Sequence, residues 1–187
     1  MLLWLLTTQT AADEPVSDWS DLAVLIGLSE QVSKTIDSKS ILQTGPTAGV
    51  AWHRSSFRVD LSYAHNNNIA LGDDNSGTFS TNALSASISP TLYNRMGHPV
   101  AYYGGGAALV AYRAQITESR WNGWSMDHDE LQRTIALHAL FAWRIVHRES
   151  FAVELCYTQR YNFLNNEVIG KRHRILSLNL WLRPEDL

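Results

Sequence analysis

Seven histidines are the side chains from which a general base would be drawn. A nucleophilic enzyme would hold one of them within hydrogen-bond reach of a serine and a carboxylate. No histidine lies in a His-x-Ser-Asn segment, and the best combination joins His138 to a serine and Glu154. An interior histidine that is hydrogen-bonded to its neighbours explains the same residues more simply. We therefore predict no catalytic residue and no enzymatic activity.

Metal and cofactor chemistry is equally sparse. The sequence Asp-His-Asp-Glu at 127–130 offers oxygen ligands for a hard cation such as calcium, but we interpret it as a solvated acidic loop. The single cysteine, Cys156, excludes a site built from several cysteines and an intrachain disulfide. The three glycines at 104–106 lie inside a predicted strand with no helix after them, so they do not form a phosphate loop. No metal site and no cofactor is predicted.

Composition bounds the class of protein. The chain has 187 residues, of which 45% are hydrophobic and 18% are charged, so it should fold as one domain. Fifteen basic and eighteen acidic residues give a formal charge of -3 with no basic run, which argues against nucleic acid as a partner. No stretch of eighteen residues is continuously apolar, so a transmembrane helix is excluded, whereas membrane-spanning strands are not.

The amino terminus has the features of a secretory signal. An apolar run at 1–6 is followed by small and polar residues to Ala12 and then by Asp13, Glu14 and Pro15. We predict a truncated signal segment at 1–12, a polar lead-in at 13–20 and a β-barrel domain at 21–187. A buried or frayed terminal segment is the alternative for 1–12.

From about residue 21 the hydrophobic pattern has a period of two, which is typical of strands. Eight strands are predicted at 21–33, 44–54, 57–66, 80–94, 98–116, 130–147, 150–163 and 172–183. Short turns are expected at 53–56, 93–98 and 147–150, and long polar loops at 66–77 and 118–130. The longer connections all fall at one end of an up-and-down array, as in bacterial outer-membrane barrels.

The two faces of these strands decide which solvent surrounds the barrel. Residues 150–163 place Phe151, Val153 and Leu155 on one face and Glu154, Arg160 and small residues on the other. A soluble lipocalin-like barrel would bury the apolar face, and its charges would face water. Burying the charged face in a dry core would leave several arginines with few carboxylates, so we predict the reverse arrangement, with a polar lumen and an apolar exterior.

Two sets of residues follow from this assignment. We expect a polar network in the lumen that stiffens the barrel rather than forming a selective pore. On the strand at 98–116 we predict that Gly105, Ala107 and Arg113 face the lumen. Trp121 and Trp124 fall in a loop where they would contact a surface sugar or the membrane interface. The lumen network is Arg58, Asp60, Arg113, His138, Arg144, Glu154 and Arg160. The aromatic residues expected at the membrane interfaces are Trp52, Tyr63, Tyr102, Tyr112, Trp143, Phe151, Tyr161 and Phe163.

The glycine-rich stretch 99–113, PVAYYGGGAALVAYR, resembles a strand of small outer-membrane β-barrel proteins of the OmpX, OmpW and OmpA-membrane-domain type. Residues 175–182 resemble the terminal strand that the barrel-assembly machinery reads, although 183–187 follow where that signal ends in an aromatic residue. The resemblance implies an eight-stranded antiparallel up-and-down transmembrane barrel in the bacterial outer membrane. It also implies contacts with outer-membrane lipid and lipopolysaccharide, insertion by the assembly machinery, and a monomer.

We expect a structural role, a role in surface interaction or limited solute permeation, with no catalysis. Three alternatives stay open. One is a membrane-embedded enzyme that modifies lipid A, another is a soluble lipocalin-like ligand carrier, and the third is a solitary autotransporter-like barrel, which would need more strands than this chain supplies.

Overall fold

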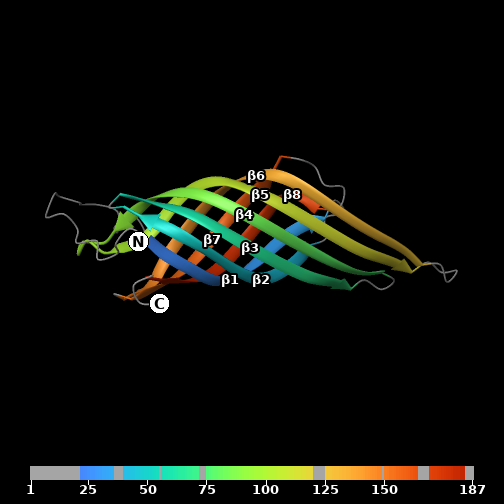
Figure 1. The fold of residues 1–187 in the computed structure, drawn as a ribbon, viewed down its shortest axis with the longest axis horizontal. Coiled ribbons are helices and arrows are strands. Elements are labelled where there is room, and N and C mark those ends of the chain that lie inside the picture. The colour runs from blue at the N-terminus through green and yellow to red at the C-terminus, as the bar shows by residue number, and fades with distance from the viewer. Residues whose placement is uncertain are drawn as a thin grey trace, which may run out of the picture.

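The computed structural model describes residues 22–35, 40–54, 56–71, 75–119, 125–148, 150–163 and 169–183. Within these residues eight antiparallel strands close into one barrel, and each strand pairs with its neighbour in the sequence (Figure 1). The described residues contain no helix long and apolar enough to cross a membrane. The strands are β1 Leu22–Thr35, β2 Ser40–His53, β3 Phe57–Leu71, β4 Asn75–Tyr93, β5 Pro99–Ser119, β6 Ser125–His147, β7 Phe151–Asn162 and β8 Ile169–Leu182.

Barrel closure comes from the pairing of the first and last strands. Val24 of β1 lies opposite Leu182 of β8, and the ladder continues from there along β1. Closure pairs every strand on both sides, so the sheet presents no free edge to a second chain. The start of β1, the end of β8 and the three short turns lie at one end of the barrel, and the β3–β4 and β5–β6 hairpins extend at the other (Figure 1).

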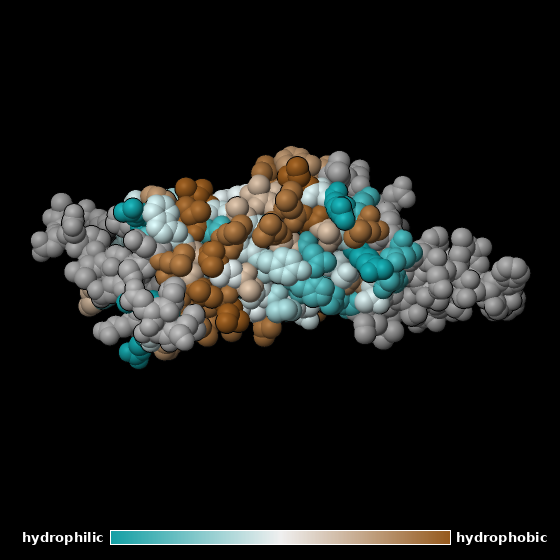
Figure 2. Space-filling view, in the orientation of Figure 1, coloured by the Kyte–Doolittle hydropathy of each residue, from teal (hydrophilic) through white to brown (hydrophobic). Residues whose placement is uncertain are grey.

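Side chains alternate between a polar interior and an apolar exterior. Outward-facing Leu28 and Leu109 are 68% and 61% exposed, whereas inward-facing Glu154 is 0% exposed. On the visible face apolar residues gather toward the end with the short turns, and polar residues become more frequent toward the long hairpins (Figure 2). This is the predicted inside-out arrangement, and a soluble barrel with an apolar interior would show the opposite one.

The turn between β4 and β5 shows how the sequence fixes a short connection. The Asn94 side-chain oxygen accepts hydrogen bonds from the backbone N–H groups of Met96 and His98, at 2.9 and 3.0 Å. Gly97 has a φ of 79°, a left-handed conformation that glycine adopts without steric cost. These two residues hold the chain in a tight reversal, as the pattern predicted.

Two of the predicted long loops are largely strand. The β3–β4 ladder continues to Leu71 opposite Ser76, and the β5–β6 ladder continues to Ser119 opposite Ser125. The backbone hydrogen bonds of a hairpin do not require apolar side chains, so the ladder runs on through polar sequence that hydropathy assigned to loops. The predictions for 1–12 and 13–20, and those for Trp121 and Trp124, lie outside the described residues.

The orientation of β5 differs from the prediction. Ala107 and Arg113 face outward and are exposed, while Tyr102 and Tyr112 face the lumen and are 0% and 1% exposed. Glycine and alanine occupy both faces of this strand, and Leu109 and Val110 stand on opposite faces, so its hydropathy assigns neither face. The outward orientation of Arg113 and the inward orientation of the two tyrosines are corrections to the sequence-based assignment.

Candidate functional site in the barrel lumen

Four charged side chains meet inside the barrel near the short turns. Arg58 and Asp60 stand at the start of β3, Arg144 near the end of β6, and Glu154 near the start of β7. Each lies within a few residues of a short turn, at a strand position whose side chain faces inward. All four side chains therefore lie at the same end of the lumen. We call Arg58, Asp60, Arg144 and Glu154 the turn-end cluster.

Glu154 is the centre of the turn-end cluster. One carboxylate oxygen accepts from Arg144 Nε and Nη2 at 3.0 and 2.8 Å. The other accepts from Arg58 Nη1 at 2.8 Å and from the Trp181 indole N–H at 2.6 Å. Arg58 also pairs with Asp60 through a 2.9 Å contact between Nε and a carboxylate oxygen. Two guanidiniums and two carboxylates balance one another, as buried charges require.

Aromatic rings enclose the same guanidiniums. The Arg58 guanidinium lies 3.9 Å from the Tyr102 ring centroid and 4.9 Å from that of Trp181, and Arg144 lies 5.1 Å from Tyr102. The His53 ring meets Tyr102 and Trp181 edge-on, with centroids 5.9 and 6.1 Å away. Cation–π contacts of this kind add to the attraction of each ion pair where water is excluded. Ion pairs and rings from six strands therefore occupy one level of the lumen.

A second group of buried polar residues lies farther toward the long hairpins. Ser33 bonds His173 Nδ1 at 2.7 Å, and the Tyr112 hydroxyl lies 3.1 Å from His173 Nε2. The Asn162 amide donates to the Tyr112 hydroxyl at 2.7 Å, and the Tyr112 and His173 rings are stacked. We call Ser33, Tyr112, Asn162 and His173 the hairpin-end cluster. These side chains are joined by hydrogen bonds and ring stacking across four strands.

His138 and Arg160 are buried in the lumen wall between neighbouring strands. They face each other across the β6–β7 ladder, and Arg160 faces His173 across the β7–β8 ladder. Among the described side chains no carboxylate forms an ion pair with Arg160. The predicted lumen residues thus fall into separate groups, with four in the turn-end cluster and two beside the hairpin-end cluster.

Arg113 is the predicted lumen residue that the structure places elsewhere. Its guanidinium faces outward, is about half exposed, and pairs with Asp129 of β6 at 2.6 Å. Two further hydrogen bonds join the pair and its neighbour Gln115. The side chain belongs to the outer wall of the β5–β6 hairpin because the parity of β5 is the reverse of the one predicted.

The predicted interface aromatics divide in a similar way. Tyr102 and Tyr112 belong to the lumen, where one contacts the arginines of the turn-end cluster and the other hydrogen-bonds His173. Sequence reasoning missed both, since a tyrosine on a strand of small residues carries no signal of the face it occupies. The outward-facing members are Trp52, Tyr63, Trp143, Phe151, Tyr161 and Phe163.

No catalytic constellation emerges from the described side chains. The oxygens of Glu154 are engaged by two arginines and a tryptophan, so this carboxylate is not positioned to orient His138. Among the described residues no three His, Cys, Asp or Glu side chains gather as metal ligands do. The side chains of Asp127, His128 and Glu130 lie outside the described set. The residues of the turn-end and hairpin-end clusters bind one another through ion pairs, hydrogen bonds and ring contacts.

Comparison with known proteins identifies the fold. The chain matches no family model and no curated protein sequence. It is similar in structure to the attachment invasion locus protein Ail of Yersinia pestis, with a TM-score of 0.65 at 11% identity over 88% of this chain and 99% of that one. It is also similar to Neisserial surface protein A, with a TM-score of 0.63 at 17% identity over 86% and 96% of the two chains. Ail has also been solved in complex with the heparin analogue sucrose octasulfate. The chain therefore has the closed eight-stranded fold of these small barrels.

Proposed function

We propose that the protein is an integral β-barrel of the bacterial outer membrane, with a structural or surface-interacting role and no catalytic activity. The observation that carries this proposal is the apolar outer wall. Large aliphatic and aromatic side chains face outward on all eight strands, while the turn-end cluster, Arg160 and several amide side chains face the lumen. Such a surface is stable in hydrocarbon and would aggregate in water.

Orientation in the membrane follows from the unequal ends of the barrel. Outer-membrane barrels have short turns on the periplasmic side and longer extracellular connections. The short turns at 54–56, 94–98 and 148–150 would then face the periplasm, and the β3–β4 and β5–β6 hairpins would extend from the cell surface. These hairpins are the part available to an external partner. Ail supplies a precedent at the level of fold, since it has been solved with a heparin analogue.

The lumen favours a closed barrel over a conducting pore. The turn-end cluster forms three ion pairs at one level of the lumen. The rings of Tyr102 and Trp181 lie at the same level, and both rings and Glu154 are almost completely buried. An ion passing this level would have to separate paired charges. We expect planar-bilayer recordings of the purified barrel to show no stable conductance, so that limited permeation is the least favoured of the roles predicted from the sequence.

A location in the outer membrane also determines which partners we propose. The outer wall would contact outer-membrane lipid and lipopolysaccharide, and the barrel-assembly machinery would insert the chain. A barrel closed by β1–β8 pairing leaves no strand edge to recruit a second copy, which supports a monomer.

The decisive experiment is fractionation of cells that express the chain behind a working signal sequence. We expect the product in the outer-membrane fraction, with different gel mobilities before and after heating in detergent, because a closed barrel resists unfolding by detergent at room temperature. A product that stays monodisperse in buffer without detergent would refute the proposal and favour a soluble ligand carrier. Release of fatty acid or phosphate from lipid A by the purified barrel would instead favour the enzyme alternative.

A further inference from the structure

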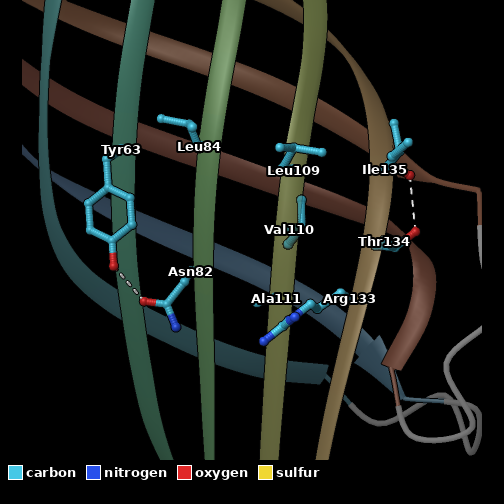
Figure 3. Close-up of a pocket in the computed structure, with 9 residues that line it drawn as sticks. All are labelled: Tyr63, Asn82, Leu84, Leu109, Val110, Ala111, Arg133, Thr134 and Ile135. Carbon is cyan, nitrogen blue, oxygen red and sulfur yellow. Dashed lines mark hydrogen bonds between the residues drawn. The ribbon is translucent and has the colours of Figure 1, made fainter.

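A groove of about 420 Å³ crosses the outer wall of the barrel over β3, β4, β5 and β6 (Figure 3). It is open to the surroundings of the barrel and lies outside the lumen, so it is separate from the clusters described above. The residues that line it come from all four of these strands.

Strand register divides this groove into an apolar row and a polar row. Leu84, Leu109 and Ile135 are cross-strand partners and form the apolar row. Asn82, Ala111 and Arg133 lie two positions farther along their strands, toward the long hairpins. They are also cross-strand partners and form the polar row. Figure 3 shows the two rows side by side, with the Tyr63 hydroxyl directed at Asn82, to which it donates a 2.7 Å hydrogen bond.

Ala111 gives the polar row its floor. A methyl side chain stands there between Asn82 on one strand and Arg133 on the next, so the wall is hollowed at this point. Arg133 extends along this floor toward Asn82 in Figure 3. A cation and an amide thus border a shallow site whose other side is aliphatic.

The depth of Arg133 in the membrane can be worked from β6. The outward residues from Ile145 to Ile135 are apolar, and Arg133 is the next outward residue. Ten residues at about 3.3 Å each, tilted by about 40°, span about 25 Å, which is the height of the apolar band in outer-membrane barrels. The guanidinium therefore stands where hydrocarbon gives way to lipid headgroups, on the side of the long hairpins.

The two outward arginines of the β5–β6 hairpin differ in their partners. Arg113 is paired with Asp129 at 2.6 Å, and no carboxylate forms an ion pair with Arg133 among the described side chains. A cation at headgroup depth attracts an anionic lipid. Arg133 is complementary to a phosphate group, and the apolar row beside it is complementary to an acyl chain. The ligand that fits both is a lipid whose acylated headgroup carries a phosphate.

We infer that the groove is a binding site for the lipid A part of lipopolysaccharide, with an acyl chain along Leu84, Leu109 and Ile135 and a phosphate on Arg133. The inference rests on the proposed location, because lipopolysaccharide fills the leaflet on the side of the long hairpins in an outer membrane. Asn82 completes the headgroup contacts through its amide, and Ala111 leaves room for the first carbons of the chain.

The test measures retention of diphosphorylated lipid A by the purified barrel in octyl glucoside, read by native mass spectrometry. We expect the wild type to retain lipid A, Arg133→Gln to weaken retention about fivefold, and Ala111→Phe to abolish it by filling the floor. Matched controls are Arg113→Gln, which removes an outward arginine that already has a partner, and Ala139→Phe, which adds the same ring elsewhere on the outer wall of β6. Both controls should retain lipid A as the wild type does.

Two further ligands separate the sources of the phosphate. Dephosphorylated lipid A should bind the wild type and Arg133→Gln equally, and phosphatidylglycerol should be retained less well than lipid A. Equal retention of phosphatidylglycerol, or a loss in Arg113→Gln as large as in Arg133→Gln, would overturn the assignment.

Heat-modifiable mobility is measured on every variant first. A wild type that lacks it, or that is soluble without detergent, defeats the proposed location. A heat-modifiable barrel that binds lipid A equally with and without Arg133 defeats the binding site alone.

Discussion

Replacing Glu154 by glutamine tests whether ion pairing holds the lumen together. Glu154 is 0% exposed and accepts four hydrogen bonds of 2.6 to 3.0 Å from Arg58, Arg144 and Trp181. Glutamine keeps the shape but removes the charge and turns an N–H₂ group toward the guanidiniums. The turn-end cluster would then contain two guanidiniums and one carboxylate in a space that water does not reach.

The expected cost follows from this imbalance. Breaking a buried ion pair by removing one partner costs about 3–5 kcal/mol, because the remaining charge stays desolvated. Asp60 continues to pair with Arg58 at 2.9 Å, so the loss falls mainly on the ion pair between Arg144 and Glu154. We therefore expect Glu154→Gln to lower the free energy of unfolding by about 3 kcal/mol, at the low end of that range.

Urea unfolding of the barrel in lipid vesicles, followed by tryptophan fluorescence, measures this loss. Glu30→Gln is the matched control, because Glu30 is exposed on the outer wall, and its replacement should change stability by less than about 0.5 kcal/mol. The double variant Glu154→Gln, Arg144→Met removes both charges and should recover much of the loss. Equal stability of the Glu154 and Glu30 variants would refute the reasoning and indicate a hydrated lumen.

Three other outcomes are expected. A methyl group at Gly106 would collide with the carbonyl oxygen of Ala86 on β4. Gly106→Ala should therefore destabilise the barrel by about 1–3 kcal/mol in the same urea assay. The control is Ala107→Ser at an exposed site, and equal unfolding midpoints for the two variants would contradict this prediction. Hydrogen bonding from Arg113 lowers the pKa of Asp129 from its ordinary value, so the ion pair persists above that lowered pKa and is lost as the pH falls through it. NMR titration should show the midpoint rising in Arg113→Gln, and an unchanged midpoint would mean that the pair does not form. The Cys156 thiol is buried in the lumen and should react with a maleimide only after the barrel unfolds in urea. As a control, Tyr157→Cys in a Cys156→Ala background should react with a lipid-soluble maleimide in the folded barrel, because residue 157 faces outward. Rapid labelling of Cys156 in the folded barrel would mean that it faces outward, contrary to the structure.

Strand positions and most strand faces could be read from the sequence. In β7, Phe151, Val153 and Leu155 alternate with Ala152, Glu154 and Cys156, and the structure places the first set outward and the second inward. The contrast between large apolar and charged residues is strong there, so a shift of one residue would move every charge into hydrocarbon. Such a strand admits a single orientation.

The orientation of β5 could not be read in this way. Its glycines and alanines suit either face, so Tyr102 and Tyr112 were assigned to the membrane interface. Their burial depends on what other strands present to them, namely Arg58 and Arg144 beneath Tyr102 and His173 against Tyr112. A cation or a ring supplied by a distant strand leaves no trace in the local alternation.

The sequence by itself determined that this chain is a barrel with a polar interior, because each strand had to separate charge from hydrocarbon and the pattern of that separation is local. Only the tertiary structure decided which charges pair. Arg58 and Glu154 are 96 residues apart in the chain, yet barrel closure brings them to 2.8 Å. The outer groove has the same origin, since Asn82, Ala111 and Arg133 become neighbours only through the register of three strands. Contacts between strands depend on register and closure, which are properties of the whole barrel.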